Sequence, residues 1–142
     1  MENINNIVFP NVHEFMCMGM DSGYASLSEW RNIAAGYSEI SILWQGRNKL
    51  ILAPKPIDGG LISYHKAQFG YEINCVTPEA FTSETANNFI SDARALKAIE
   101  DFAKARSPVG FISWGGTPGA YALLNKIKKA NPFMRRRFAR AA

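Results

Sequence analysis

The feature that most constrains the fold is a glycine-rich turn placed between an apolar run and a helical pattern. The run is Val109–Ser113, the turn is Trp114–Gly119, and apolar residues recur at helical spacing from 120 to 127. Thr117 suits a helix N-cap, and Pro118 suits the first helical position, where its missing N–H costs nothing. A buried strand, a tight turn and a helix in succession are typical of an α/β domain.

The rest of the chain alternates between β-rich and helical patterns in the same way. Strand patterns cover 7–9, 40–44, 50–53, 71–76 and 109–113, and helical patterns cover 26–37, 61–69, 91–106 and 117–130. Ser26 and Glu29 have the spacing of a capping box, Ser91 is a plausible N-cap, and Gly70 stands where a left-handed cap is expected. The short segment 45–48 predicts a hairpin between 40–44 and 50–53.

These patterns predict a small Rossmann-like, three-layer α/β domain with a mainly parallel sheet and with an N-terminal helix and hairpin. The chain has 142 residues, 47% of them hydrophobic, which is enough for one buried core. We expect a single domain over residues 1–132, in which 1–25 form a poorly defined lead-in. Residues 133–142 are expected to form a basic tail.

The net charge of +4 is concentrated in that tail. Arg135, Arg136, Arg137 and Arg140 account for it, so the domain itself is balanced and does not favour a nucleic-acid ligand. The tail mixes aromatic and arginine residues, which suits either contact with RNA or an anionic membrane, or a solvated chain end.

Only Cys17 and Cys75 are present, and the polar start of the chain lacks a signal-peptide pattern. No apolar run approaches the roughly 18–20 residues that a membrane helix needs. We therefore expect a cytoplasmic protein with two free thiols and no membrane contact.

Other residues with chemical potential lack the partners that a site requires. His13 and Cys17 lie one helical turn apart beside the methionine-rich segment 16–20, but no second cluster completes a soft-metal site. We expect these methionines to fill an edge of the core. His65 has no recognisable nucleophile beside it, so the sequence predicts neither a metal site nor a catalytic residue.

Two loops are candidates for binding a ligand because both follow strands of the predicted parallel sheet. The glycine-rich turn directs backbone N–H groups and a helix N-terminus to one place, which favours phosphate or carboxylate. It is not a dinucleotide or phosphate-loop motif, so a purely structural turn stays an alternative. The candidate substrate-binding residues are Lys55, Asp58, Gly59, Gly60, Trp114, Gly115, Gly116 and Thr117.

Several ordered segments carry a family resemblance over roughly residues 40–130. They are Leu52–Asp58, a helix with Tyr64 that ends at Phe69-Gly70, the strand Ile73–Pro78, and Phe111–Pro118 followed by Tyr121–Leu124. Together they resemble the N-terminal, Rossmann-like pre-ATP-grasp domain of ATP-grasp ligases, especially ligases that form peptide bonds in natural-product biosynthesis.

This resemblance implies a role in joining a carboxylate to an amine through an acyl phosphate. It also implies that ATP and magnesium bind later domains, so that no cofactor is bound by this chain alone. Because the chain stops at Ala142, we expect it to be catalytically incomplete and to work with an ATP-grasp catalytic domain or subunit. Its small-molecule ligand would then be the carboxylate or the amine substrate.

Two other functions remain open. The chain would be a stand-alone module that binds a small anionic metabolite at 114–119. Alternatively, it would be an interaction protein that docks through Trp30, Trp44 and Trp114, with 40–44 pairing as a sheet edge in a homodimer.

Overall fold

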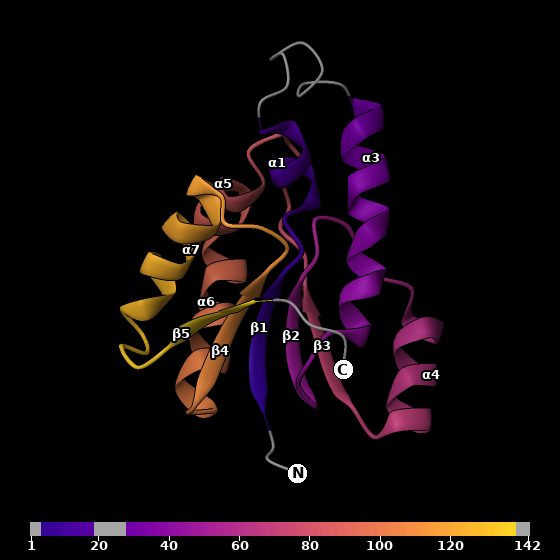
Figure 1. Ribbon diagram of the computed structural model, residues 1–142, viewed down its shortest axis with the longest axis vertical. Coiled ribbons are helices and arrows are strands. Elements are labelled where there is room, and N and C mark those ends of the chain that lie inside the picture. Colours follow the sequence, from indigo (N-terminus) through magenta and orange to yellow (C-terminus); the bar gives the residue numbers. More distant parts are fainter. Residues whose placement is uncertain (1–3, 19–27, 139–142) are drawn as a thin grey trace.

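The structure, a computed structural model, describes residues 4–18 and 28–138, with 135–138 described as backbone. Five parallel strands form one sheet in the order β3-β2-β1-β4-β5, and helices cover both faces (Figure 1). The strands are β1 (Asn5–Phe9), β2 (Asn48–Leu52), β3 (Glu72–Val76), β4 (Val109–Ser113) and β5 (Arg135–Phe138). The helices are α1 (Val12–Cys17), α3 (Ser28–Gly36), the 3-10 helix η1 (Tyr37–Leu43), α4 (Gly59–Phe69), α5 (Thr85–Ile90), α6 (Ala93–Ala105) and α7 (Pro118–Lys128). The predicted Rossmann-like three-layer fold is confirmed.

The strand at the centre of the sheet is the first in the chain. β1 pairs with β2, where Ile7 lies opposite Leu50, and with β4, where Ile7 lies opposite Phe111. Parallel pairing on both sides buries all five residues of β1, which explains its continuous apolar run from Ile7 to Phe9.

Side chains alternate between two cores along each strand. Ile7, Phe9 and Phe111 face α5, α6 and α7, where the Phe9 ring lies 6.0 Å from that of Phe89 and 6.3 Å from that of Phe111. Val8 and Ile51 face the second core, which η1 and α4 cover.

Two helix caps follow the sequence pattern. The Thr117 hydroxyl accepts a hydrogen bond from the backbone N–H of Ala120 at 3.1 Å, and Pro118 takes the first position of α7 as predicted. Gly70 caps α4 with a φ of +65°, a conformation that favours glycine.

The predicted hairpin is wrong. Residues 37–43 form η1, and β2 pairs in parallel with β1 and β3, so 40–44 is not a sheet edge. The apolar run resembled a strand, but Ser38, Ser41 and Ile42 are the buried residues, at the three- and four-residue spacing of a helix. The version of a homodimer that relied on this edge is therefore excluded.

The predicted 91–106 helix is confirmed as α6, and a second helix that the patterns did not predict, α5, precedes it. α5 occupies 85–90, and α6 begins after Asp92, whose carboxylate accepts a hydrogen bond from Ala95 N–H at 3.0 Å, so the N-cap is Asp92 and not Ser91. Residues 135–138, expected in a tail, form β5 beside β4. The strand was not predicted because three of its four residues are arginines, a charged run that is typical of a chain end.

The helices on the second face are less buried than the patterns predicted. Ala34 and Ala35 are the buried residues of α3, whereas Ile33 is exposed. No residue of α4 is buried, and Tyr64 and Phe69 are about half exposed. The proposed capping residue Ser26 lies outside the described residues.

Candidate ligand site at the carboxyl end of the sheet

The candidate site lies where β1 and β4 end beside each other. From this edge β1 leads into α1 and β4 leads into the glycine-rich turn and α7 (Figure 1). Loops that diverge between adjacent parallel strands form the usual ligand crevice of open α/β sheets. The residues that follow β1, in and before α1, therefore determine which ligand fits this crevice.

Asn11 fixes the glycine-rich turn from the end of β1. Its side-chain Nδ2 donates to the Thr117 Oγ1 at 2.8 Å and to the Gly115 carbonyl at 3.2 Å, and its Oδ1 accepts from Gly115 N–H at 3.2 Å. The Ser113 hydroxyl donates to the same carbonyl at 2.9 Å. These three polar side chains are buried, so the turn is held rigidly in the fold.

Glu14 occupies the N-terminal end of α7. The backbone N–H of Gly119 donates to Glu14 Oε1 at 2.7 Å, and Glu14 Oε2 is buried without a hydrogen-bond partner among the residues that the structure describes. A Cβ atom at position 119 would overlap this carboxylate, so a larger residue there would displace Glu14 from the Gly119 N–H. The anion that the turn was predicted to attract is therefore supplied by the chain itself.

The other predicted loop lies two strands away. β1 separates β2 from β4, so Lys55 and Asp58 leave the sheet beside α3 and α4. Lys55 Nζ donates to Asn32 Oδ1 and lies 4.6 Å from the centre of the Phe81 ring. The Asp58 carboxylate accepts from Leu61 N–H at 2.9 Å and caps α4, whose first residues are Gly59 and Gly60.

The remaining predicted residues stay with the turn. The exposed Trp114 ring lies 5.9 Å from the buried Trp44 ring, Gly115 is buried beneath Phe15, and Gly116 is exposed. Trp44 is buried and Trp30 is half-buried, so Trp114 is the exposed member of the three tryptophans.

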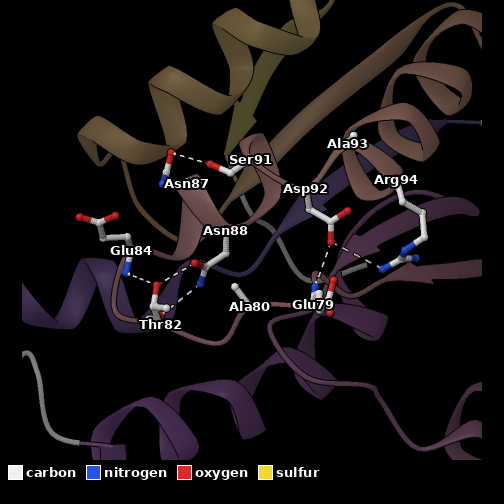
Figure 2. Close-up of a pocket in the computed structure, with 10 residues that line it drawn as sticks. All are labelled: Glu79, Ala80, Thr82, Glu84, Asn87, Asn88, Ser91, Asp92, Ala93 and Arg94. Carbon is white, nitrogen blue, oxygen red and sulfur yellow. Dashed lines mark hydrogen bonds and ion pairs between the residues drawn. The ribbon is translucent and has the colours of Figure 1, made fainter.

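Two pockets open beside this crevice, one on each side of α5. The smaller, about 480 Å³, contains Glu14 and Gly119 together with Glu84, Thr85 and Asn87. The larger, about 610 Å³, is drawn in Figure 2 and shares Glu84 and Asn87 with the first. The two pockets therefore adjoin at Glu84 and Asn87, and together we call them the groove along α5.

Hydrogen bonds within the larger pocket hold its opposite sides. On one side the Thr82 hydroxyl donates to Asn88 Oδ1 at 2.7 Å. On the other the Asp92 carboxylate accepts from Glu79 N–H at 2.9 Å and lies 3.7 Å from Arg94 (Figure 2). The bonds from the backbone N–H groups of Ala95 and Glu79 are the main causes that hold the pKa of Asp92 below its ordinary value.

The two thiols are not activated. Cys17 Sγ lies 3.7 Å from His13 Nε2, but burial raises the pKa of Cys17, and burial raises the pKa of Cys75 to about 11. Within 4–18 and 28–138 no three His, Cys, Asp or Glu residues are grouped to hold a metal ion. Met16 and Met18 are exposed rather than part of the core, and Gly19 and Met20 lie outside the described residues.

His65 is part of an aromatic stack. The His65 ring lies 5.5 Å from the Phe69 ring and meets the Tyr64 ring edge-on at 5.4 Å. The Phe69 ring in turn lies 5.5 Å from the Tyr71 ring. These contacts give His65 a packing role on α4, away from the crevice between β1 and β4.

Comparison with protein-family models, curated proteins and solved structures gave no match for this chain. None of the helices in the described ranges has both the length and the apolar character needed to span a bilayer.

Sequence reasoning missed the residues that define the crevice and groove: Asn11, Glu14, Glu84 and Thr85. The first two belong to a segment that was treated as a lead-in, although a short strand at 7–9 placed them directly after a sheet strand. The signal for Glu84 and Thr85 was weak because α5 has only six residues.

Proposed function

We propose that this chain is a catalytically incomplete, substrate-binding domain of an ATP-dependent carboxylate–amine ligase. The resemblance to pre-ATP-grasp domains supplies the reaction class, and the Rossmann-like sheet with open loops at its carboxyl edge agrees with a domain that forms part of a substrate pocket. ATP and magnesium would be bound by the catalytic partner.

The observation that carries the proposal is the contact between Glu14 and Gly119. A nucleotide phosphate at this crevice would need the α7 N-terminus, which a carboxylate already occupies at 2.7 Å. The turn also carries no lysine, so the residues present do not fit a nucleotide phosphate. The groove along α5 stays open for a substrate.

Calorimetry of the isolated chain with MgATP tests the proposal. We expect no binding up to the order of 1 mM and no release of phosphate, because Glu14 already occupies the α7 N-terminus and the crevice residues that the structure describes do not fit a phosphate. Saturable ATP binding by the isolated chain in the micromolar range would overturn it. Adding an ATP-grasp catalytic domain as a separate protein should then restore ATP-dependent amide formation.

A stand-alone metabolite-binding module is the second candidate. The groove favours it because residues of this chain alone line both of its pockets. The anionic ligand expected for such a module is disfavoured at the turn, because Glu14 would repel it. The two candidates differ in one measurement: only the ligase domain forms a stoichiometric complex with a catalytic subunit.

A further inference from the structure

The charges of this chain are segregated along the sequence. Residues 102–142 contain nine lysine and arginine residues and no aspartate or glutamate, whereas residues 1–101 contain seven basic and twelve acidic residues. The net charge is therefore +9 in the C-terminal part and −5 in the rest of the chain. The C-terminal excess is larger than the four tail arginines, because it also includes Lys104, Arg106, Lys126, Lys128 and Lys129.

The fold gathers these cations at one place. α6 and α7 run antiparallel to the strands, so both helices end at the edge of the sheet where β4 and β5 begin (Figure 1). A hydrogen bond joins the two helix ends, because Asn131 Nδ2, just after α7, donates to the Ala103 carbonyl in the last turn of α6 at 3.0 Å. β5 begins beside them at Arg135, opposite Gly110 of β4. We call this area the basic surface, and its described cations are Lys104, Arg106, Lys126, Lys128 and Lys129.

The positive charges of the basic surface are not neutralised by neighbouring carboxylates. Lys104, Lys128 and Lys129 are exposed, and none of the five cations forms an ion pair with a residue that the structure describes. The acidic residue closest to them along α6, Asp101, is paired with Lys97. Lysines in the last turn of a helix stabilise its negative end, but this interaction leaves their ammonium groups in solvent. The basic surface therefore presents uncompensated positive charge to a ligand.

An exposed aromatic ring at the same place is an independent observation. Phe133 is 84% exposed, the highest value among the large hydrophobic residues that the structure describes. The turn that presents it is fixed on both sides: the buried Asn131 accepts from Phe133 N–H at 3.1 Å through Oδ1, and the next residue, Met134, belongs to the core. The fold itself therefore holds the ring in solvent. An aromatic ring held out of a positive surface matches a ligand that combines negative charge with flat apolar groups.

We propose that the basic surface binds single-stranded nucleic acid. The phosphates supply the negative charges that the lysines contact, and an unpaired base supplies the flat face that stacks on Phe133. Arginine, which supplies three of the four residues of β5, is well suited to bidentate contacts with phosphate. A duplex fits less well, because its bases are stacked on one another and do not reach the Phe133 ring. An anionic membrane is disfavoured because Phe133 is the one large apolar side chain that is exposed among the described residues of α6 and of 122–134.

Nucleic-acid binding at this surface goes beyond the proposed ligase function and does not depend on it. The basic surface lies at the edge where the strands begin, whereas the candidate ligand crevice lies where β1 and β4 end. The sequence-based expectation against a nucleic-acid ligand assumed that the excess charge belongs to a tail outside a balanced domain. Because residues 135–138 form β5 beside β4, three of those arginines belong to the folded domain.

The test is fluorescence anisotropy of labelled oligouridylate and oligothymidylate strands of about 12 nucleotides, titrated with the full chain at several salt concentrations. We expect saturable binding whose logarithm falls against the logarithm of the salt concentration with a slope of about −3, as for about four phosphate contacts. The strand that binds more tightly identifies RNA or DNA as the preferred source, and a duplex of the same length should bind more weakly. Absence of binding to both strands, or a duplex affinity equal to or higher than theirs, overturns the proposal. Sedimentation with vesicles that contain phosphatidylserine, when neither strand binds, would assign the surface to a membrane instead.

Variants of the ring and of the lysines locate the contact. Phe133→Ala should weaken binding about tenfold without lowering the midpoint of thermal unfolding, because the ring is exposed, and Phe133→Trp should retain binding. The double variant Lys128→Gln/Lys129→Gln should weaken binding and reduce the size of the salt slope by about 1. Lys66→Gln, which removes an exposed lysine of α4, is the matched control and should bind as the unmodified chain does. Unchanged affinity in both Phe133→Ala and the double lysine variant, or an equal loss in Lys66→Gln, would contradict the proposal.

Discussion

Lys49 is a fully buried cation in the middle of the sheet, and its replacement tests how burial affects this fold. Its side chain is 0% exposed, and its register neighbours are Asn6 on β1 and Ile73 on β3. Nζ donates to the Ile42 carbonyl of η1 and lies 4.5 Å from the centre of the Tyr71 ring. Neither contact supplies the negative charge that a buried ammonium needs.

The magnitude follows from the pKa of Lys49, which burial lowers from 10.5 to about 8. Each pKa unit corresponds to about 1.4 kcal/mol, so protonation of Lys49 in the folded state costs about 3 kcal/mol. Between pH 8 and 10.5 the unfolded chain holds a proton that the folded chain has lost. The free energy of unfolding therefore rises with pH across this interval, and the cost is complete below pH 8.

The perturbation is Lys49→Met, which keeps an unbranched side chain and removes the charge. The loss of the hydrogen bond to Ile42 offsets part of the gain by about 1–3 kcal/mol, so at pH 7 we expect a stability equal to or up to about 2 kcal/mol above that of the unmodified chain. Urea unfolding at intervals from pH 7 to 10.5 gives the decisive comparison. The advantage of the variant should fall by about 3 kcal/mol over this range.

Lys66→Met is the control, because Lys66 is an exposed lysine of α4. Its stability should follow the pH profile of the unmodified chain. Parallel profiles for Lys49→Met and the unmodified chain would refute the reasoning, since they would show that Lys49 titrates alike in the folded and unfolded states.

Three further predictions concern the crevice and the second core. Burial raises the pKa of Cys75 from 9.0 to about 11, so between these pH values the unfolded chain loses a proton that the folded chain keeps. The free energy of unfolding therefore falls with pH in this interval, and urea unfolding of Cys75→Ala should no longer show that fall. Gly119→Ala should destabilise the chain by about 1 kcal/mol, because the added Cβ displaces the Glu14 carboxylate from the Gly119 N–H. A Glu14→Ala background should remove most of this cost in a double-mutant cycle, and additivity would contradict the contact. Thr117→Ala, which removes the cap on Ala120, should cost about 1–2 kcal/mol by thermal unfolding, and an unchanged midpoint would show that the cap contributes nothing.

The parts of the fold that the sequence predicted were those with strong local chemistry. The turn and cap at Thr117–Pro118, the glycine cap at Gly70 and the strand at 109–113 depend on single residues or short apolar runs. The apolar run at 40–44 is compatible with a strand and with a helical turn, and the sequence alone did not distinguish the two. The structure shows a helical spacing of buried residues there, which depends on how the segment packs against the sheet.

The candidate site was predictable only in part, because its residues come from segments far apart in the chain. The turn at 114–119 was identified, but its occupant, Glu14, is about a hundred residues earlier and carries no motif. Lys55 and Asp58 belong to the second predicted loop, and the strand order, which the patterns do not encode, places β1 between the strand before that loop and the strand before the turn. The groove along α5 depends on packing between α5, α6 and the preceding loop.

The central position of β1 has a consequence for how the chain folds. β1 meets β2 through a connection of moderate length, but Asn5 pairs with Val109, so its second side is completed only after most of the chain has been made. Contacts between such distant segments slow folding and leave the unpaired side of a strand open to wrong partners. During synthesis, β1, β2 and β3 would form a half-sheet in which the β4 side of β1 is still unpaired. Substitutions that weaken β4 should therefore lower the yield of folded protein more than they lower its final stability.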